Sequence, residues 1–184
     1  MNARITASLG AVAAAALLAA CGSDADNSAE NHNAADVTFA TEMIPHHLQA
    51  VEMSEMAATR ASRSEVLQLA EEIAGAQGPE IETMSGWLEA WGEPVPEGMD
   101  GMDMAGMPGM MSEEQMQALG EASGPAFDEM FLEMMIEHHT GAIQMAQTEQ
   151  SEGQYSEAID LAAQIEEAQT AEVETMQNLL ATNE

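Results

Sequence analysis

The chain contains an internal duplication with a period of 92 residues. Residues 43–53 read Met-Ile-Pro-His-His-Leu-Gln-Ala-Val-Glu-Met, and residues 135–145 read Met-Ile-Glu-His-His-Thr-Gly-Ala-Ile-Gln-Met. The same offset, without a gap, aligns further matched positions: Phe39 with Phe131, Gln77 with Gln169, and residues 82–84 with 174–176. The duplication predicts two copies of one structural unit, each with a His-His segment and a later Met-bearing segment.

The first 20 residues are typical of a lipoprotein signal peptide. They contain one basic residue, Arg4, followed by an apolar run that ends in Leu18-Ala-Ala before Cys21. The run is too short to span a bilayer, and lipidation of Cys21 after cleavage would anchor the mature protein to an envelope membrane, on the periplasmic or extracytoplasmic side. A plain secretory signal or an uncleaved anchor is the alternative. Residues 21–35 are polar and acidic, which predicts a flexible tether.

Composition limits the chemistry that the mature chain can perform. The only cysteine is Cys21, so a disulfide framework and a thiolate metal site are both excluded. The 33 acidic residues all follow the signal segment and face only Arg60 and Arg63, which gives the mature chain a formal charge of 2 − 33 = −31. Nucleic acid is therefore excluded as a partner, because phosphate binding depends on basic side chains. The 17 methionines, against six aromatic residues, leave thioethers as the available soft ligands.

Residues 36–184 predict an all-α, up-and-down four-helix bundle made of two duplicated helical hairpins. Repeat one covers about 36–92 and repeat two about 125–184. Asp36 is expected to cap a first helix that ends near Thr59. The second helix is expected to start at Ser64, or at Ser62 with a capping box closed by Glu65, and to end at Trp91-Gly92, with Gly78-Pro79 bending or breaking it. The other helices are expected at 125–150 and 156–182.

Each His-His segment lies on a helical stripe that also carries methionine. Di-iron bundles place a glutamate three residues before the inward histidine, whereas Met43 and Met135 stand three residues before His46 and His138. A site that combines thioether and imidazole favours copper over iron or manganese. Packing in the core is the alternative role for the methionines later in each unit, which are Met53, Met84, Met145 and Met176.

The linker between the two hairpins, residues 93–111, is rich in methionine, glycine and proline. Gly and Pro prevent a regular helix here, so the sequence offers these thioethers no core to fill. We expect this segment to bind Cu(I) or a partner through its methionines, which are Met99, Met102, Met104, Met107, Met110 and Met111. A short helix opened by Ser112 is expected to follow.

Three ordered motifs resemble the bacterial family called domain of unknown function 305. They are Phe39-x3-Met-Ile-Pro-His-His-x2-Ala-x2-Met53, Gln77-x2-Glu-Ile-x2-Met-x2-Trp-Leu-x2-Trp-Gly92 and Phe131-x3-Met-Ile-x-His-His-x-Gly-Ala-Ile-x-Met145. The resemblance covers residues 36–180 and implies a ferritin-like fold, export, and kinship with periplasmic copper-binding proteins linked to copper resistance. It implies metal ligands at His46, His47, His138 and His139, with Met43, Met53, Met135 and Met145 as companions and Met84 and Met176 facing them.

The sequence therefore predicts a lipid-anchored envelope protein that binds copper, Cu(I) in preference to Cu(II), and buffers it or hands it to a copper-handling partner. No nucleophile constellation or phosphate loop indicates an enzyme. Two alternatives stay open. One is a ferritin-like metal oxidase in which Glu42, Glu133 and Glu137 join the histidines. The other is a metal-free interaction module that docks a partner through the Met-rich linker.

Overall fold

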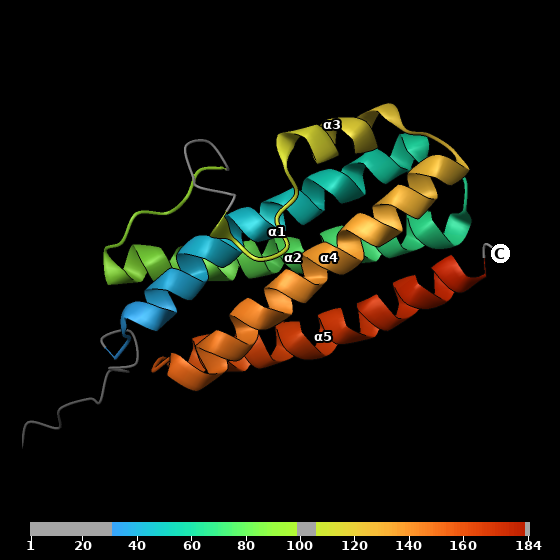
Figure 1. The fold of residues 1–184 in the computed structure, drawn as a ribbon. Coiled ribbons are helices and arrows are strands. Elements are labelled where there is room, and N and C mark those ends of the chain that lie inside the picture. Colours follow the sequence, from blue (N-terminus) through green and yellow to red (C-terminus); the bar gives the residue numbers. More distant parts are fainter. Residues whose placement is uncertain (1–30, 99–105, 183–184) are drawn as a thin grey trace, which may run out of the picture.

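The computed structural model describes residues 31–98 and 106–182, and these residues form five helices and no strand (Figure 1). Four helices are long, and they are α1 (Ala34–Arg60), α2 (Ser64–Trp91), α4 (Pro125–Glu152) and α5 (Ser156–Ala181). The short α3 (Glu113–Glu121) follows the Met-rich linker. The all-α bundle of two hairpins, α1–α2 and α4–α5, is confirmed. Cys21 and the Met-rich residues 99–105 lie outside the described ranges.

The order of the helices differs from the simple up-and-down arrangement expected from the sequence. α1 and α4 run in opposite directions, and the Gly124 amide at the start of α4 donates to the Arg60 carbonyl at the end of α1, at 2.8 Å. The two hairpins therefore meet through equivalent helices, α1 against α4, as identical units do about a two-fold axis. As a result α2 and α4 run the same way, which is the helix order of ferritin-like bundles that have one long crossover connection.

The helix starts show which capping predictions were right. Asn33, not Asp36, caps α1, and Asp36 closes the capping box from the third helical position. Ser62 does not cap α2, which begins after Arg63 without a side-chain cap. Ser112 caps α3 through the Gln115 amide, as expected.

Gly78-Pro79 does not break α2, which is continuous from Ser64 to Trp91. Pro79 is exposed, so its ring lies away from the packed face of the helix. The Thr83 hydroxyl donates to the Pro79 carbonyl at 2.8 Å one turn later. The missing amide of Pro79 therefore costs α2 one backbone hydrogen bond without ending it.

Two buried aspartates tie the hairpins together crosswise. Asp36 of α1 accepts the amides of Gln154 and Tyr155 in the α4–α5 loop, both at 2.9 Å. Its repeat equivalent, Asp128 of α4, accepts the Ser62 and Arg63 amides of the α1–α2 loop, at 3.0 and 3.1 Å. Each histidine-bearing helix thus holds the loop of the opposite hairpin.

The core divides into two apolar clusters, and each contains one member of every repeated methionine pair. We call the group around Met53, Met135 and Met176 the α3-side cluster, because Leu119 of α3 packs in it. We call the group around Met43, Met84 and Met145 the open-end cluster. Along α1 and α4 the histidines lie between a methionine of one cluster and a methionine of the other. None of the helices in the described ranges has the length and apolarity needed to cross a membrane.

Candidate metal centre

The four repeated histidines form a buried polar layer halfway along the bundle. All four have no exposed surface, although nothing in a helix core by itself requires an imidazole there. The His46 ring of α1 lies against the His138 ring of α4, with centroids 3.8 Å apart. The structure therefore brings together the two histidines that the repeated stripes place at equivalent positions.

His47 and His139 each face a glutamate on the second helix of their own hairpin. His47 Nε2 lies 2.7 Å from Glu80 Oε2, and His139 Nε2 lies 2.6 Å from Glu172 Oε2. The carboxylates accept the Nε2 protons, which leaves a lone pair on each Nδ1. Neither glutamate was predicted as a site residue, although Glu80 and Glu172 are related by the 92-residue offset that identified the histidines.

The linker breaks the symmetry of the other two histidines. His46 Nε2 donates to the carbonyl of Pro108 at 3.1 Å, whereas neither ring nitrogen of His138 has a hydrogen-bond partner. The linker also docks on Gln49, whose side chain accepts the Met111 amide at 2.7 Å and donates to the Met111 carbonyl at 3.0 Å. The repeat equivalent of Gln49 is Gly141, where the backbone of Pro108 and Gly109 packs closely.

Burial keeps the imidazoles of His46 and His138 neutral. Burial, reinforced by neighbouring His47, lowers the pKa of His46 to about 3. Burial and His46 likewise lower the pKa of His138 well below its ordinary value. The Nδ1 atoms of all four histidines are buried without a hydrogen-bond partner. Buried polar atoms are rarely left unpaired, so each of these Nδ1 atoms is available to a ligand.

Two buried amides add unpaired atoms near the same level of the bundle. Gln77 of α2 has no partner for either amide atom, and Oε1 of its repeat equivalent Gln169 is also unpartnered. Each lies one turn before the glutamate that faces a histidine. The repeated glutamines noted in the sequence therefore belong to the surroundings of the histidine layer.

The predicted thioether ligands are placed as follows. Met43, Met84, Met135 and Met176 are buried at 0% exposure, as is Met53, while Met145 is 8% exposed. Met107 and Met110 are half-buried, and Met111 is only 2% exposed within the α3-side cluster, so the expectation that the linker methionines have no core to fill is wrong for Met111. Met99, Met102 and Met104 lie outside the described residues.

Carboxylates do not complete a hard-metal cage around the histidines. Within residues 31–98 and 106–182, no three side chains from His, Cys, Asp and Glu are arranged to hold a metal ion. Glu133 and Glu137 are exposed, and Glu42 is half-buried. Any ion in the layer would need donors beyond these residue types, and thioethers of the flanking methionines are the chemically suitable ones.

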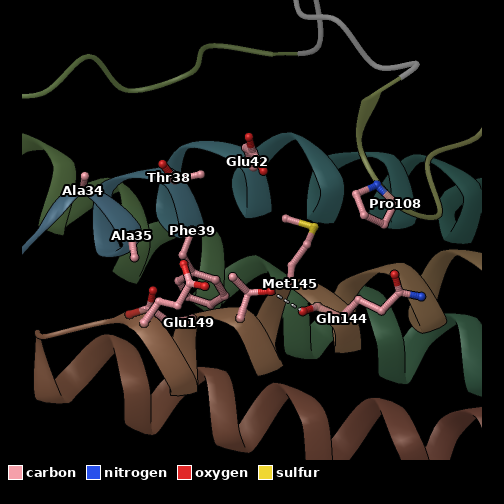
Figure 2. A pocket seen from close by; sticks show the side chains of 11 residues that line it. Ala34, Ala35, Thr38, Phe39, Glu42, Pro108, Gln144, Met145 and Glu149 are labelled. Atoms are coloured by element: carbon pink, nitrogen blue, oxygen red, sulfur yellow. Dashed lines mark hydrogen bonds between the residues drawn. The ribbon is translucent and has the colours of Figure 1, made fainter.

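A cavity of about 480 Å³ lies between the first half of α1 and the second half of α4 (Figure 2). Its wall includes Thr38 and Glu42 of α1, Met145, Glu149 and Glu152 of α4, and Pro108 of the linker. Glu149 is 1% exposed, and its carboxyl group lies against the carboxyl group of Asp36. Its burial, with a contribution from neighbouring Asp36, raises the pKa of Glu149 to about 8.

The sequence profile of the family Domain of unknown function (DUF305) matches residues 36–180. Among solved structures, a DUF305 protein from Streptomyces coelicolor is 37% identical, with a TM-score of 0.73, over 80% of this chain and 91% of that one. A DUF305 fragment from Deinococcus radiodurans is 30% identical, with a TM-score of 0.74, over 82% and 97% of the two chains.

The similar solved structures also include a copper protein. The Cu(II)-bound form of CopM is 33% identical to this chain, with a TM-score of 0.70, over 81% of this chain and 97% of that one. CopM has also been solved in Cu(I)-bound and Ag-bound forms. No curated protein sequence matches this chain significantly.

Proposed function

Because the chain belongs to the DUF305 family, we propose that it is an extracytoplasmic copper-binding protein that holds the ion with its histidine layer and flanking methionines. The observation that carries the proposal is the set of four buried Nδ1 atoms without partners. Three of the rings donate their Nε2 protons, two to carboxylates and one to a carbonyl, so Nδ1 carries the lone pair.

The chemistry of the donors supports copper over other metals. Neutral imidazole binds several transition metals, whereas thioether sulfur selects soft ions such as Cu(I). Six repeated methionines flank the histidines in two clusters, and the carboxylates that iron or manganese would prefer do not converge there. The copper-bound and silver-bound structures of CopM are consistent with this preference. We therefore favour Cu(I) as the bound ion, with Cu(II) as the second candidate.

We further propose a role in buffering copper or handing it to a copper-handling protein of the envelope, not in catalysis. The oxidase alternative needs Glu133 and Glu137 beside the histidines, and both are exposed. The signal segment and Cys21 support attachment to the membrane through lipid. Mass spectrometry of the native protein should find acyl groups on an N-terminal Cys21 and no residue of 1–20; an unmodified Cys21 would contradict the anchor.

The copper proposal is tested by titrating the metal-free protein with Cu(I) and, separately, with Cu(II). We expect His46→Ala combined with His138→Ala to lose most tight binding while helicity measured by circular dichroism is retained. The matched control is His32→Ala, because His32 stacks on Trp91 at 4.5 Å, outside the layer, and should bind copper as the parent does. Equal copper affinity and stoichiometry in the parent and the double variant would overturn the proposal.

A further inference from the structure

The two ends of the α1–α4 interface are equivalent by the 92-residue repeat, but in the part of the chain that the structure describes they are lined differently, and the cavity lies at one of them. The cavity residues Ala35, Thr38 and Glu42 correspond to Phe127, Met130 and Met134 at the other end. Those larger side chains pack with Leu119 and Met116 of α3 in the α3-side cluster. The second end is thus filled by side chains and covered by a helix, as Figure 1 shows for α3.

The two ends also differ in charge. Glu149 and Glu152 of the cavity correspond to Ala57 and Arg60, and Glu42 corresponds to Met134. Arg60 and Arg63 are the only basic residues in the described ranges, and both lie at the end away from the cavity. Arg60 and Arg63 offset part of the negative charge at the far end, so a cation is attracted more strongly toward the cavity end.

The inner wall of the cavity leads to the candidate metal centre. Met145 belongs to the cavity wall and to the open-end cluster, and in Figure 2 its thioether extends from α4 toward α1 between Glu42 and Pro108. The carbonyl of Pro108, another wall residue, holds His46 Nε2. A cation in the cavity is thus next to the Met145 thioether, and Pro108 of the same wall contacts His46 of the histidine layer.

We propose that this acidic cavity is the route by which copper ions enter and leave the histidine layer, an inference that rests on the copper-binding function proposed above. Glu42 and Glu152 attract the cation at the rim, and Met145 is the first thioether that it meets along the cavity wall.

The test compares rates of loading with copper bound at equilibrium. Cu(I) is supplied as its cationic acetonitrile complex, and bicinchoninate added at set times in a quenched-flow instrument measures by its colour the copper that the protein has not yet taken up. Thr38→Trp places a large ring on the exposed cavity wall, and we expect loading to slow about tenfold or more while bound copper at equilibrium is unchanged. The control Thr59→Trp adds the same ring to an exposed site of α1 away from the cavity and should load as the parent does.

A second set of variants removes charge instead of space. Glu42→Gln combined with Glu152→Gln should slow loading about tenfold at low salt, since steering by charge changes rates by ~10–1,000-fold. Glu71→Gln combined with Glu167→Gln changes net charge equally on the outer faces of α2 and α5 and should have little effect. If Thr38→Trp fails to fold, the comparison of the Glu42 and Glu152 variant with this control tests the route.

The outcomes separate the route from the function. A parent protein that binds no copper would refute the proposed function itself. Copper binding with parent-like loading rates in Thr38→Trp, or in the Glu42 and Glu152 variant when Thr38→Trp does not fold, would refute the route alone. Leu119→Ala loosens α3 over the other end, and faster loading in that variant would place the route under α3 and also overturn the proposal.

Discussion

Gly109 of the linker lies directly against Gly141 of α4, so closely that a Cβ atom on Gly141 would stand 2.7 Å from the Gly109 Cα. Gly109 has φ +75°, and a Cβ atom there would meet the Glu137 carbonyl oxygen at 2.7 Å. The contact sets the linker at the height where the Pro108 carbonyl meets His46. Two glycines thus determine how the linker covers the histidine layer.

Gly141→Ala should lower the free energy of unfolding by about 1–3 kcal/mol, the usual cost of overpacking a close contact. Urea unfolding followed by circular dichroism measures the change. Gly86→Ala is the control: that glycine lies in α2 with nothing within 4 Å of an added Cβ, so it should stabilise by roughly 0.5–1 kcal/mol. Equal stability of the parent and Gly141→Ala would show that the linker does not need this approach.

Glu80 and Glu172 should strengthen metal binding without contacting the metal, because they hold His47 and His139 with Nδ1 unprotonated. Glu80→Gln combined with Glu172→Gln is expected to weaken copper affinity about 10–100-fold, the usual effect of losing such partners. Competition titration against a copper chelator measures it. Glu82→Gln with Glu174→Gln, two exposed glutamates on the same helices, is the matched control. The assignment fails if both pairs change the affinity equally.

The sequence predicted the bundle well because its strongest signals were local or repeated. Helical periodicity located the four long helices, and the 92-residue offset identified the histidines and six of the methionines as equivalent. The relative direction of the two hairpins, in contrast, is not determined by any local sequence pattern. The up-and-down order failed because the pairing of α1 with α4 depends on how two copies meet, which no single helix pattern contains.

The linker and the helix starts show a second kind of limit. Met111 enters the core because Gln49 binds its backbone, a contact between residues 62 positions apart that composition does not indicate. Asp36 looked like a cap because of its residue type, but Asn33 three residues earlier offers the capping side chain. Glu80 and Glu172 could have been found, since the offset that matched the histidines also matches these glutamates.

Asp36 and Asp128 should be among the most important residues for stability. Each accepts two backbone amides from the opposite hairpin in a fully buried position. Asp128→Ala leaves the Ser62 and Arg63 amides without this acceptor and should cost about 3–6 kcal/mol, from two hydrogen bonds to a carboxylate at ~1.5–3 kcal/mol each. Urea unfolding measures it, with exposed Asp160→Ala as the control. A decrease in the free energy of unfolding no larger than that of the control would contradict the role of the hydrogen bonds that Asp36 and Asp128 accept from the opposite hairpin.

The Met-rich linker should add a weaker class of Cu(I) sites to the buried one. Thioethers need no deprotonation before they bind, but ordering a segment around an ion consumes part of the binding free energy. Met102→Leu combined with Met104→Leu keeps apolar bulk and removes sulfur. We expect Cu(I) titration of this variant to lose weak sites only, and Met116→Leu in α3 to match the parent. Identical titrations for the parent and both variants would mean that Met102 and Met104 do not bind Cu(I) and that the linker only connects the two hairpins.

The metal-free protein should lose stability in mild acid because of its buried histidines. The pKa of His46 is 6.5 in an ordinary setting and about 3 in the fold, so between these values the unfolded chain binds more protons than the folded protein. The contribution of His46 to the free energy of unfolding is therefore fully present above pH 6.5, and it is lost by about 1.4 kcal/mol per pH unit as the pH falls below that value. His138 acts in the same direction.

Glu149 has the opposite effect, since its pKa is raised from 4.5 to about 8 and stability falls as pH rises between those values. The histidine contribution is isolated by comparing the parent with His46→Gln combined with His138→Gln, because both proteins keep Glu149. Urea unfolding without metal at intervals from pH 7 to pH 5 should show a smaller acid loss in the double variant than in the parent. Parallel curves for the two proteins would mean that the buried imidazoles do not resist protonation, and the neutral, ligand-ready state of the layer would then have to be abandoned.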